Sequence, residues 1–192
     1  AIALFSGLGN AHAQDMVWWE GEDTVETNFP KESDFLPANQ EQADKLTAGA
    51  WLNASGRYAE GEKPLYAKYT ITVPSDGSYQ LWSRKFWKHG PFKWRFNNDE
   101  WKFITRDVSL AQNVSLRKHL TSSWVFMKDV TLTQGEHQFE IELTDPESKT
   151  ACFDTFLLFK GSFVPNGNLK PGQKTGDVID DSFFAWEPSP DP

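Results

Sequence analysis

Cysteine, positive charge and long apolar stretches are all scarce in this sequence. The chain of 192 residues has one cysteine, Cys152, so no disulfide bond within the chain stabilises the fold. Its 19 Lys and Arg residues are outnumbered by 27 Asp and Glu residues, and the formal net charge of −8 argues against nucleic acid or an anionic membrane as the main partner. No stretch approaches the roughly 18 consecutive apolar residues of a membrane span, so no membrane span is expected.

The sequence also lacks the side-chain patterns that catalysis requires. Its four histidines, at positions 12, 89, 119 and 137, do not have the spacing of zinc ligands. No nucleophile is paired with a base, and Glu140 and Glu142 alternate with apolar residues, which assigns them to the outer face of a strand. We therefore expect a protein that is not an enzyme.

Tryptophan, by contrast, is abundant. The chain has nine Trp residues, and aromatic residues make up 15% of it. Much of this Trp lies in strand-like or turn-like segments, and a soluble domain does not need so much of it to fill a core. We expect some Trp side chains at the surface. Cys152 lies in the apolar run 151–159 and is expected to be a small buried hydrophobe.

The first thirteen residues resemble the end of a secretory signal peptide. A short apolar stretch is followed by small residues and by Ala11-His12-Ala13, which matches the A-x-A pattern before a cleavage site. We expect cleavage after Ala13 and a secreted or periplasmic protein whose mature chain begins at Gln14.

From residue 65 onward, apolar and polar residues alternate with the period of a half-buried β-strand. Strands are predicted over 65–73, 78–87, 92–96, 124–132, 137–144 and 151–160, with turns such as Pro74-Ser-Asp-Gly77 between them. Short strands separated by turns, with almost no helix, predict an all-β fold, namely an antiparallel β-sandwich of the jelly-roll type.

Three segments depart from the strand pattern. Asn39, with Gln42 three residues later, predicts a capped short helix over 40–46. Residues 105–123 are polar with weak periodicity and predict either a long loop or a short helical excursion. Residues 162–192 are rich in turn residues and are expected to form a linker toward a further domain, so the sandwich itself is assigned to 15–161.

Four motifs occur in the order in which a known group of proteins carries them. They are Glu20-Gly-Glu22 in the first strand, Gly77-Ser-Tyr-Gln-Leu-Trp-Ser-Arg84 in a hairpin strand, Ser123-Trp124 before a turn at Gly135, and Phe153-Asp-Thr-Phe156 in the last strand. Together they resemble the carbohydrate-binding modules of families 6, 35 and 36 over residues 17–161. The resemblance implies a jelly-roll sandwich that binds a polysaccharide or oligosaccharide without catalysing a reaction.

The resemblance also implies a structural calcium ion (Ca2+) held by Glu20, Glu22 and Asp154. Glu20 and Glu22 are two residues apart on a strand and so point to the same face, and Ca²⁺ prefers several hard oxygen ligands. Two alternatives stay open. Either the two glutamates are the solvated face of an edge strand, or Arg84 or a lysine compensates the charge of Asp154 in place of a metal.

In the resembling families, sugar binds in a cleft at the loop edge, where exposed aromatic rings stack on the apolar faces of pyranoses. The resemblance assigns this role to Trp124 and to an aromatic residue of an earlier loop, which is Trp51 or Tyr58. Trp87 lies at a strand end and is expected to be exposed, so it joins these candidates. Where the families often carry Asn before the last strand, this sequence has Lys149-Thr150.

Packing is the competing interpretation for several of these aromatic residues. Trp124 is either a sugar contact or a packing residue, and core packing is favoured for Trp82, Trp94 and Trp101. Lys93 and Arg95 share one strand face. They form either a basic stripe suited to uronic or sulfated polysaccharide, or an ordinary solvated face with salt bridges.

Two functions follow from the sequence. In the first, the chain is an accessory module that binds polysaccharide and targets an appended C-terminal glycoside hydrolase or polysaccharide lyase. In the second, it is a structural β-sandwich that packs on a neighbouring catalytic domain without binding glycan itself. The Phe183-Phe184-Ala185-Trp186 segment supports the second, because an apolar segment near a terminus suggests docking onto this domain or the next.

Overall fold

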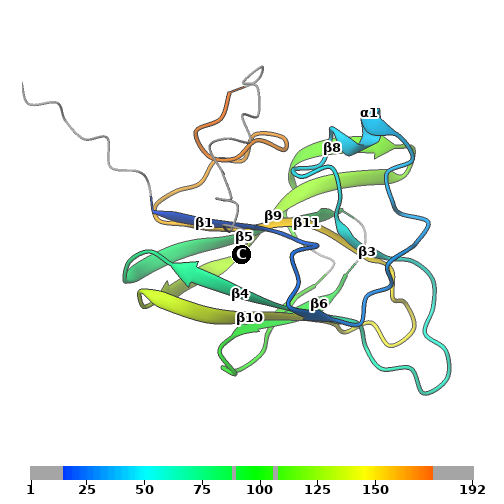
Figure 1. Cartoon of the computed structure of the whole chain (residues 1–192), viewed down its shortest axis with the longest axis horizontal. Coiled ribbons are helices and arrows are strands. Elements are labelled where there is room, and N and C mark those ends of the chain that lie inside the picture. The colour runs from blue at the N-terminus through cyan, green and yellow to red at the C-terminus, as the bar shows by residue number, and fades with distance from the viewer. Residues whose placement is uncertain (1–14, 88–89, 106–107, 175–192) are drawn as a thin grey trace, which may run out of the picture.

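A computed structural model describes residues 15–87, 90–105 and 108–174, which form two antiparallel β-sheets packed face to face (Figure 1). Sheet A has six strands in the order β1-β11-β5-β9-β8, with β3 also paired to β11, and sheet B has five in the order β2-β4-β10-β6-β7. The strands of sheet A are β1 (Met16–Glu20), β3 (Leu52–Ala54), β5 (Gly77–Phe86), β8 (Ala111–Arg117), β9 (Leu120–Leu132) and β11 (Ala151–Phe159). The strands of sheet B are β2 (Glu26–Thr27), β4 (Tyr66–Val73), β6 (Phe92–Phe96), β7 (Lys102–Ile104) and β10 (Gly135–Leu143).

The core lies between the two sheets and is built from the inward-facing residues of each strand. In β4 every second residue from Ala67 to Val73 is buried, whereas Thr70 and Thr72 between them are exposed, as the period of two predicts. At its centre, Phe139 of sheet B packs against Trp19 and Phe156 of sheet A, with ring centroids 5.3 and 5.2 Å apart. Such aromatic pairs add roughly 0.5–1.5 kcal/mol each beyond the burial of their area. The predicted all-β sandwich is confirmed.

Strand β11 is buried along its whole length, because both of its faces are covered. Phe156 belongs to the core between the sheets. Leu157 and Phe159 belong to a separate apolar cluster with Trp124 and Phe163, on the other face of sheet A. Cys152 at the start of the strand is buried, as expected.

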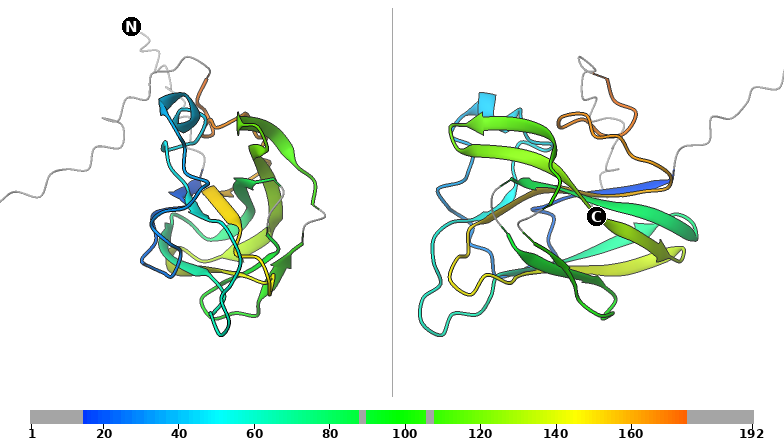
Figure 2. Two further views of the ribbon diagram at one scale, coloured as in Figure 1. Left: turned by 90° about the vertical axis from the view of Figure 1, so that its right-hand side faces the viewer. Right: turned by 180° about the vertical axis from the view of Figure 1, so that it is seen from behind.

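Two segments cover the outer side of sheet A, and both are visible above it in Figures 1 and 2. One carries the short helix α1 (Gln40–Ala43), which the Asn39 side chain caps by accepting a hydrogen bond from the Gln42 backbone N–H at 3.0 Å. The helix ends before the predicted residue 46, and the residues that follow it contact sheet A through Lys45 and Thr47. The other segment is 163–174, the first part of the expected linker. No helix of the described part is long and apolar enough to cross a membrane.

The polar stretch 105–123 contains a strand that the sequence did not predict. Strand β8 pairs with β9 across a tight turn in which His119 has a φ of 65°. Two irregularities interrupt this pairing, one between Ala111 and Val114 and one between Ser115 and Arg117. The prediction of a loop or helical excursion is therefore wrong for β8, because these irregularities break the period of two that would have marked a strand.

Candidate functional site

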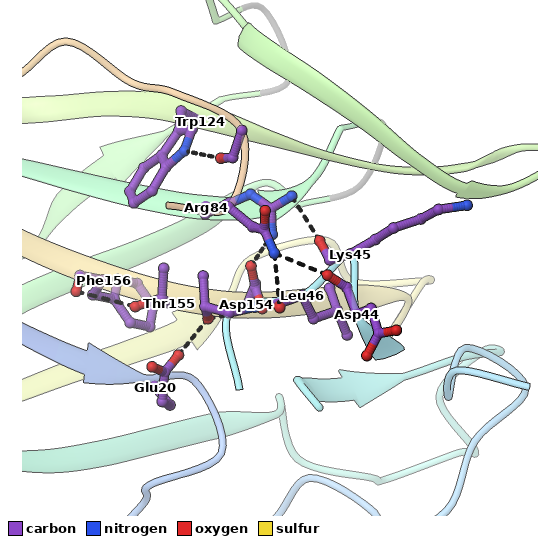
Figure 3. Close-up of polar contacts among 12 residues, drawn as sticks. Glu20, Asp44, Lys45, Leu46, Arg84, Trp124, Asp154, Thr155 and Phe156 are labelled. Atoms are coloured by element: carbon purple, nitrogen blue, oxygen red, sulfur yellow. Dashed lines mark hydrogen bonds and ion pairs between the residues drawn. The ribbon is translucent and has the colours of Figure 1, made fainter. Parts of the chain in front are cut away.

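Asp154, the predicted metal ligand of the last strand, forms an ion pair with Arg84 of β5 (Figure 3). Arg84 Nη1 donates to Asp154 Oδ2, and both side chains are fully buried. Arg84 Nη2 donates to the Lys45 carbonyl oxygen at 3.0 Å. Burial raises the pKa of Asp154 to about 6, while the charge of Arg84 acts to lower it and favours the carboxylate. The guanidinium therefore compensates a buried charge that would otherwise be costly.

Glu20 of β1 joins the same network through Thr47. The Thr47 hydroxyl lies between the two carboxylates: it donates to Glu20 Oε2 and lies 3.1 Å from Asp154 Oδ1. The Thr47 backbone N–H donates to the same Asp154 oxygen at 3.1 Å. Glu20 Oε1 accepts a hydrogen bond from the Trp18 indole at 2.7 Å and lies 3.8 Å from Lys170 Nζ. Both oxygens of Glu20 thus have donors within the protein.

One carboxylate oxygen of Glu22, the third predicted ligand, has no such partner. This oxygen, Oε2, is buried, and no hydrogen-bond partner reaches it within the described residues. Burial, with a further contribution from the charges of Glu20 and Asp154, raises the pKa of Glu22 to about 7. Nowhere in residues 15–87, 90–105 and 108–174 do three His, Cys, Asp or Glu side chains come together as metal ligands do. The structure instead shows the alternative in which Arg84 compensates Asp154, and calcium binding stays a prediction.

Two of the four aromatic residues expected to contact sugar are buried. Trp124 is 0% exposed, packs edge-on against Phe163 with ring centroids 5.1 Å apart, and donates its indole N–H to the Gly167 carbonyl oxygen at 2.8 Å (Figure 3). Trp51 is 2% exposed and donates to the Phe35 carbonyl oxygen at 2.7 Å. Trp124 therefore follows the packing interpretation, because the C-terminal segment covers its ring. The sugar-contact role proposed for Trp51 does not fit its burial, because the loop before α1 covers that ring.

The other two predicted aromatic residues differ from each other in exposure. Trp87, at the end of β5, is 39% exposed, as expected. Tyr58 is half-buried against the core, and its hydroxyl accepts a hydrogen bond from the Leu65 N–H at 3.1 Å. With Trp51 and Trp124 buried as well, the four residues do not line one open cleft.

A hollow of about 340 Å³ that contains none of these four residues lies on the outer face of sheet B. Its aromatic lining residues are Trp101 and Tyr66, and its charged ones are Lys63, Lys68, Arg95, Glu140 and Glu142. Trp101 follows a tight turn between β6 and β7, in which Asn97 and Asn98 have φ of 47° and 66°. This turn brings the half-buried Trp101 ring back over the side chains of β6.

Ion pairs between β6 and β10 hold the Trp101 ring in place. Arg95 Nη2 bonds Glu140 Oε2 at 2.7 Å, and Lys93 Nζ bonds Glu142 Oε1 at 2.7 Å. The same two cationic groups lie 4.3 and 4.6 Å from the centroid of the Trp101 ring, within cation–π distance. Each cation thus has its own carboxylate, so this surface is the salt-bridged strand face of the second interpretation and not a basic stripe.

A larger hollow of about 650 Å³ lies between α1 and the C-terminal segment, on the outer side of sheet A. Asn168 borders it and donates to the carbonyl oxygens of Asp44 and Leu46 at 3.0 and 3.1 Å, which ties the two segments together. Glu20 and Lys170 also border it. None of the described residues that line this hollow is aromatic, so it offers no stacking surface for a sugar.

Sequence reasoning assigned Trp94 and Trp101 alike to the core, and it was right for the first. Trp94 is 1% exposed, whereas Trp101 is half-buried and faces the hollow. Two signals could have identified Trp101. It directly follows a turn, and its hairpin partner strand presents the two cations Lys93 and Arg95 on the face that the ring covers.

No protein-family model and no curated protein matches this sequence, but solved structures match its fold. The GH26-CBM35 β-(1,4)-mannanase of Podospora anserina superposes with a TM-score of 0.50 and 15% identity, over 79% of this chain and 29% of that one. The CBM35 from Cellvibrio japonicus Abf62 has a TM-score of 0.47 and 10% identity, with 77% and 94% of the two chains covered. A family 35 carbohydrate binding module from Clostridium thermocellum has a TM-score of 0.46 and 14% identity, with 76% and 98% covered. The chain thus spans less than a third of the mannanase, and the resemblance inferred from the four motifs is confirmed at the level of the fold.

Proposed function

We propose that the protein is a non-catalytic module that binds a polysaccharide or oligosaccharide in the hollow lined by Trp101 and Tyr66. The observation that carries this proposal is the accessible Trp101 ring, which Arg95 and Lys93 hold beside two fixed carboxylates. The fold, shared with a protein that contains a carbohydrate-binding module, supports it.

Recognition of a sugar in water requires an apolar surface and a few oriented polar groups. Trp101 supplies a flat ring on which the C–H face of a pyranose can stack. The pairs Arg95–Glu140 and Lys93–Glu142 supply donors and acceptors that are ordered before a ligand arrives, which reduces the entropy lost on binding. The hollow of about 340 Å³ falls within the range of roughly 300–1,000 Å³ that is usual for ligand sites.

The charge balance of the hollow favours a neutral glycan. An anionic sugar would gain most from cations that lack acidic partners, but Arg95 in the hollow and Lys93 beside it are each paired with a glutamate, and Lys68 is paired with Glu26 at 2.9 Å. Lys63 is the one lining cation that forms no ion pair with another described residue. Paired charges still bond hydroxyl groups, because a guanidinium and a carboxylate each have several donor or acceptor positions.

We also propose that the module is exported and acts beside a catalytic domain. The signal-like residues 1–13 lie outside the described residues, so this part of the proposal depends on the Ala11-His12-Ala13 pattern. The Podospora anserina protein combines GH26 and CBM35 parts in one chain, which supports a similar arrangement here. In such an arrangement, the module would bind the polysaccharide substrate and so keep an attached glycoside hydrolase or polysaccharide lyase close to it.

Affinity gel electrophoresis of residues 14–192 tests the proposed function. Gels that contain mannan, xylan, glucan, galactan, pectin or alginate should retard the protein in at least one case. Trp101→Ala should weaken that interaction at least tenfold, the equivalent of about 1.4 kcal/mol. Phe126→Ala is the matched control, because Phe126 is 41% exposed but lies on sheet A. Retardation by no polymer would contradict glycan binding, and a loss with Trp87→Ala but not with Trp101→Ala would move the site to the loop edge.

A structural role beside a catalytic domain is the second candidate function, and one surface favours it. Phe126 of β9 is exposed and packs on Trp82 of β5 with ring centroids 5.2 Å apart, on a sheet face where polar residues are usual. The Phe183-Phe184-Ala185-Trp186 segment expected to dock lies outside the described residues. In a protein extended by the following domain, Phe126→Asp should lower the Tm of that domain if the sandwich packs on it.

A further inference from the structure

The buried network around Asp154 joins four separate parts of the chain (Figure 3). Asp154 comes from β11, Arg84 from β5 and Glu20 from β1, while Lys45 and Thr47 lie in the loop after α1. Arg84 connects the Asp154 carboxylate to the Lys45 carbonyl oxygen, and Thr47 connects the Asp154 and Glu20 carboxylates.

The oxygen atoms in this network are of the kinds that bind Ca²⁺, namely carboxylates and a main-chain carbonyl. In this protein, however, donors of its own already occupy them. The guanidinium of Arg84 binds the oxygens of Asp154 and Lys45, and the backbone N–H and hydroxyl of Thr47 bind the remaining Asp154 oxygen and Glu20. Of the three carboxylates, only Glu22 keeps a buried oxygen without a partner among the described residues, so Asp154 and Glu20 do not fit a metal as parts of one donor set with it.

We propose that Arg84 and Thr47 take the place of a structural metal ion, so that the loop after α1 is fixed to sheet A without a divalent cation. Arg84 supplies the positive charge and the fixed geometry, since its planar guanidinium binds two oxygens at once. Thr47 supplies the link between the two carboxylates.

Two further observations support this inference. Both Arg84 and Asp154 are fully buried, so a divalent cation at the same oxygens would lie beside a buried guanidinium and be repelled by it. Asn168 also donates to the carbonyl oxygens of Asp44 and Leu46, on either side of Lys45. The loop is thus held by Arg84 through the Lys45 carbonyl and by Asn168 through the carbonyls of Asp44 and Leu46, so each of these three carbonyls already accepts a hydrogen bond.

The first experiment measures metal dependence of the unaltered protein. Residues 14–192 are dialysed against EDTA, and the Tm is recorded with and without 5 mM CaCl₂, together with the metal content and the Trp-sensitised luminescence of added Tb³⁺. We expect the same Tm in both conditions, less than one tenth of a Ca²⁺ per chain and no luminescence gain. A reversible rise in Tm with CaCl₂, or one Ca²⁺ per chain after purification, would overturn the proposal.

The second experiment tests Arg84 directly. Arg84→Met should lower the Tm by roughly 10 °C or prevent folding, because removal of one partner of a buried ion pair leaves a buried charge. Arg95→Met is the matched control, since its ion pair with Glu140 is partly exposed, and its Tm should change by less than roughly 4 °C. A Tm of Arg84→Met within 2 °C of the unaltered protein would contradict the role of Arg84. Neither experiment depends on glycan binding.

Discussion

The indole N–H of Trp124 donates to the carbonyl oxygen of Gly167, which lies 43 residues further along the chain. Between these two residues the chain inserts the buried ring of Phe163 against Trp82, Trp124 and Phe159, with ring centroids 5.5, 5.1 and 5.6 Å apart. A segment with the composition of a linker is thereby packed as part of the sandwich.

Phe163→Ala should lower the free energy of unfolding by roughly 3 kcal/mol, because it removes a buried ring from an aromatic cluster. Urea unfolding followed by Trp fluorescence measures the change. Val164→Ala is the control, since Val164 is 81% exposed and should alter stability by less than roughly 0.5 kcal/mol. Equal stability of the two variants would show that the segment is not packed on sheet A.

In Glu22→Gln, the free energy of unfolding should fall less as the pH rises than it does in the unaltered protein. Burial raises the pKa of Glu22 from 4.5 to about 7 in the folded protein. The folded state therefore binds the proton more tightly than the unfolded state, and the stability due to Glu22 is present below pH 4.5 and lost as pH rises to about 7. Since Glu22 is only half-buried, we expect a relative gain of roughly 1 kcal/mol for Glu22→Gln between pH 5 and pH 8.

The measurement for Glu22 is the difference in unfolding free energy between variant and unaltered protein at the two pH values, so that the other titrating groups cancel. Glu136→Gln is the control, because Glu136 is exposed. A difference that stays constant from pH 5 to pH 8 would show that the carboxylate is not held in a buried environment.

Gly21→Ala should destabilise the protein by roughly 1–3 kcal/mol, as overpacking does. A Cβ atom at Gly21 would overlap the carbonyl group of Phe153, and the Gly21 N–H donates to the Asp154 carbonyl oxygen at 2.7 Å, so strands β1 and β11 cannot separate to make room. Thermal unfolding measures the effect. Gly61→Asn is the control, because no atom lies within 4 Å of a Cβ at Gly61 and Asn tolerates its φ of +75°.

Glycan binding should be insensitive to salt. A neutral sugar that stacks on Trp101 does not lose affinity when ions screen charge, whereas an acidic glycan bound by lysine and arginine does. Retardation in affinity gels at 50 and 500 mM NaCl should therefore be equal within a factor of two. A several-fold loss at high salt would indicate an acidic glycan and would favour the cations of the hollow as its main contacts.

The strands were predictable where one face is buried and the other is solvated. The alternation in β4 and β10 is such a case, since every second residue must face the core. Strand β8 was not predicted, because its register with β9 shifts twice within seven residues and its buried and exposed residues therefore do not alternate regularly.

The candidate site was less predictable because it depends on contacts between distant residues. The family resemblance assigned Trp124 to a sugar contact, but its burial depends on Phe163 and Gly167, which lie 39 and 43 residues later in the sequence. The ion pair between Arg84 and Asp154 was one of the alternatives that the sequence offered. The hydrogen bonds of Thr47 to Asp154 could not be predicted, because threonine is common in loops and no sequence pattern marks this one.

The first and last strands of the sandwich, β1 and β11, are direct neighbours, and Trp19 is paired with Phe156. Thr155 Oγ1 also donates a hydrogen bond to the Trp19 carbonyl oxygen, although the two residues are 136 positions apart in the sequence. During synthesis, β1 therefore cannot pair with β11 until nearly the whole domain has been translated. Contacts of such long range make folding slow. The N-terminal segment must therefore remain unpaired while the chain is growing, and that interval is when the nascent protein is most exposed to aggregation or to capture by a chaperone.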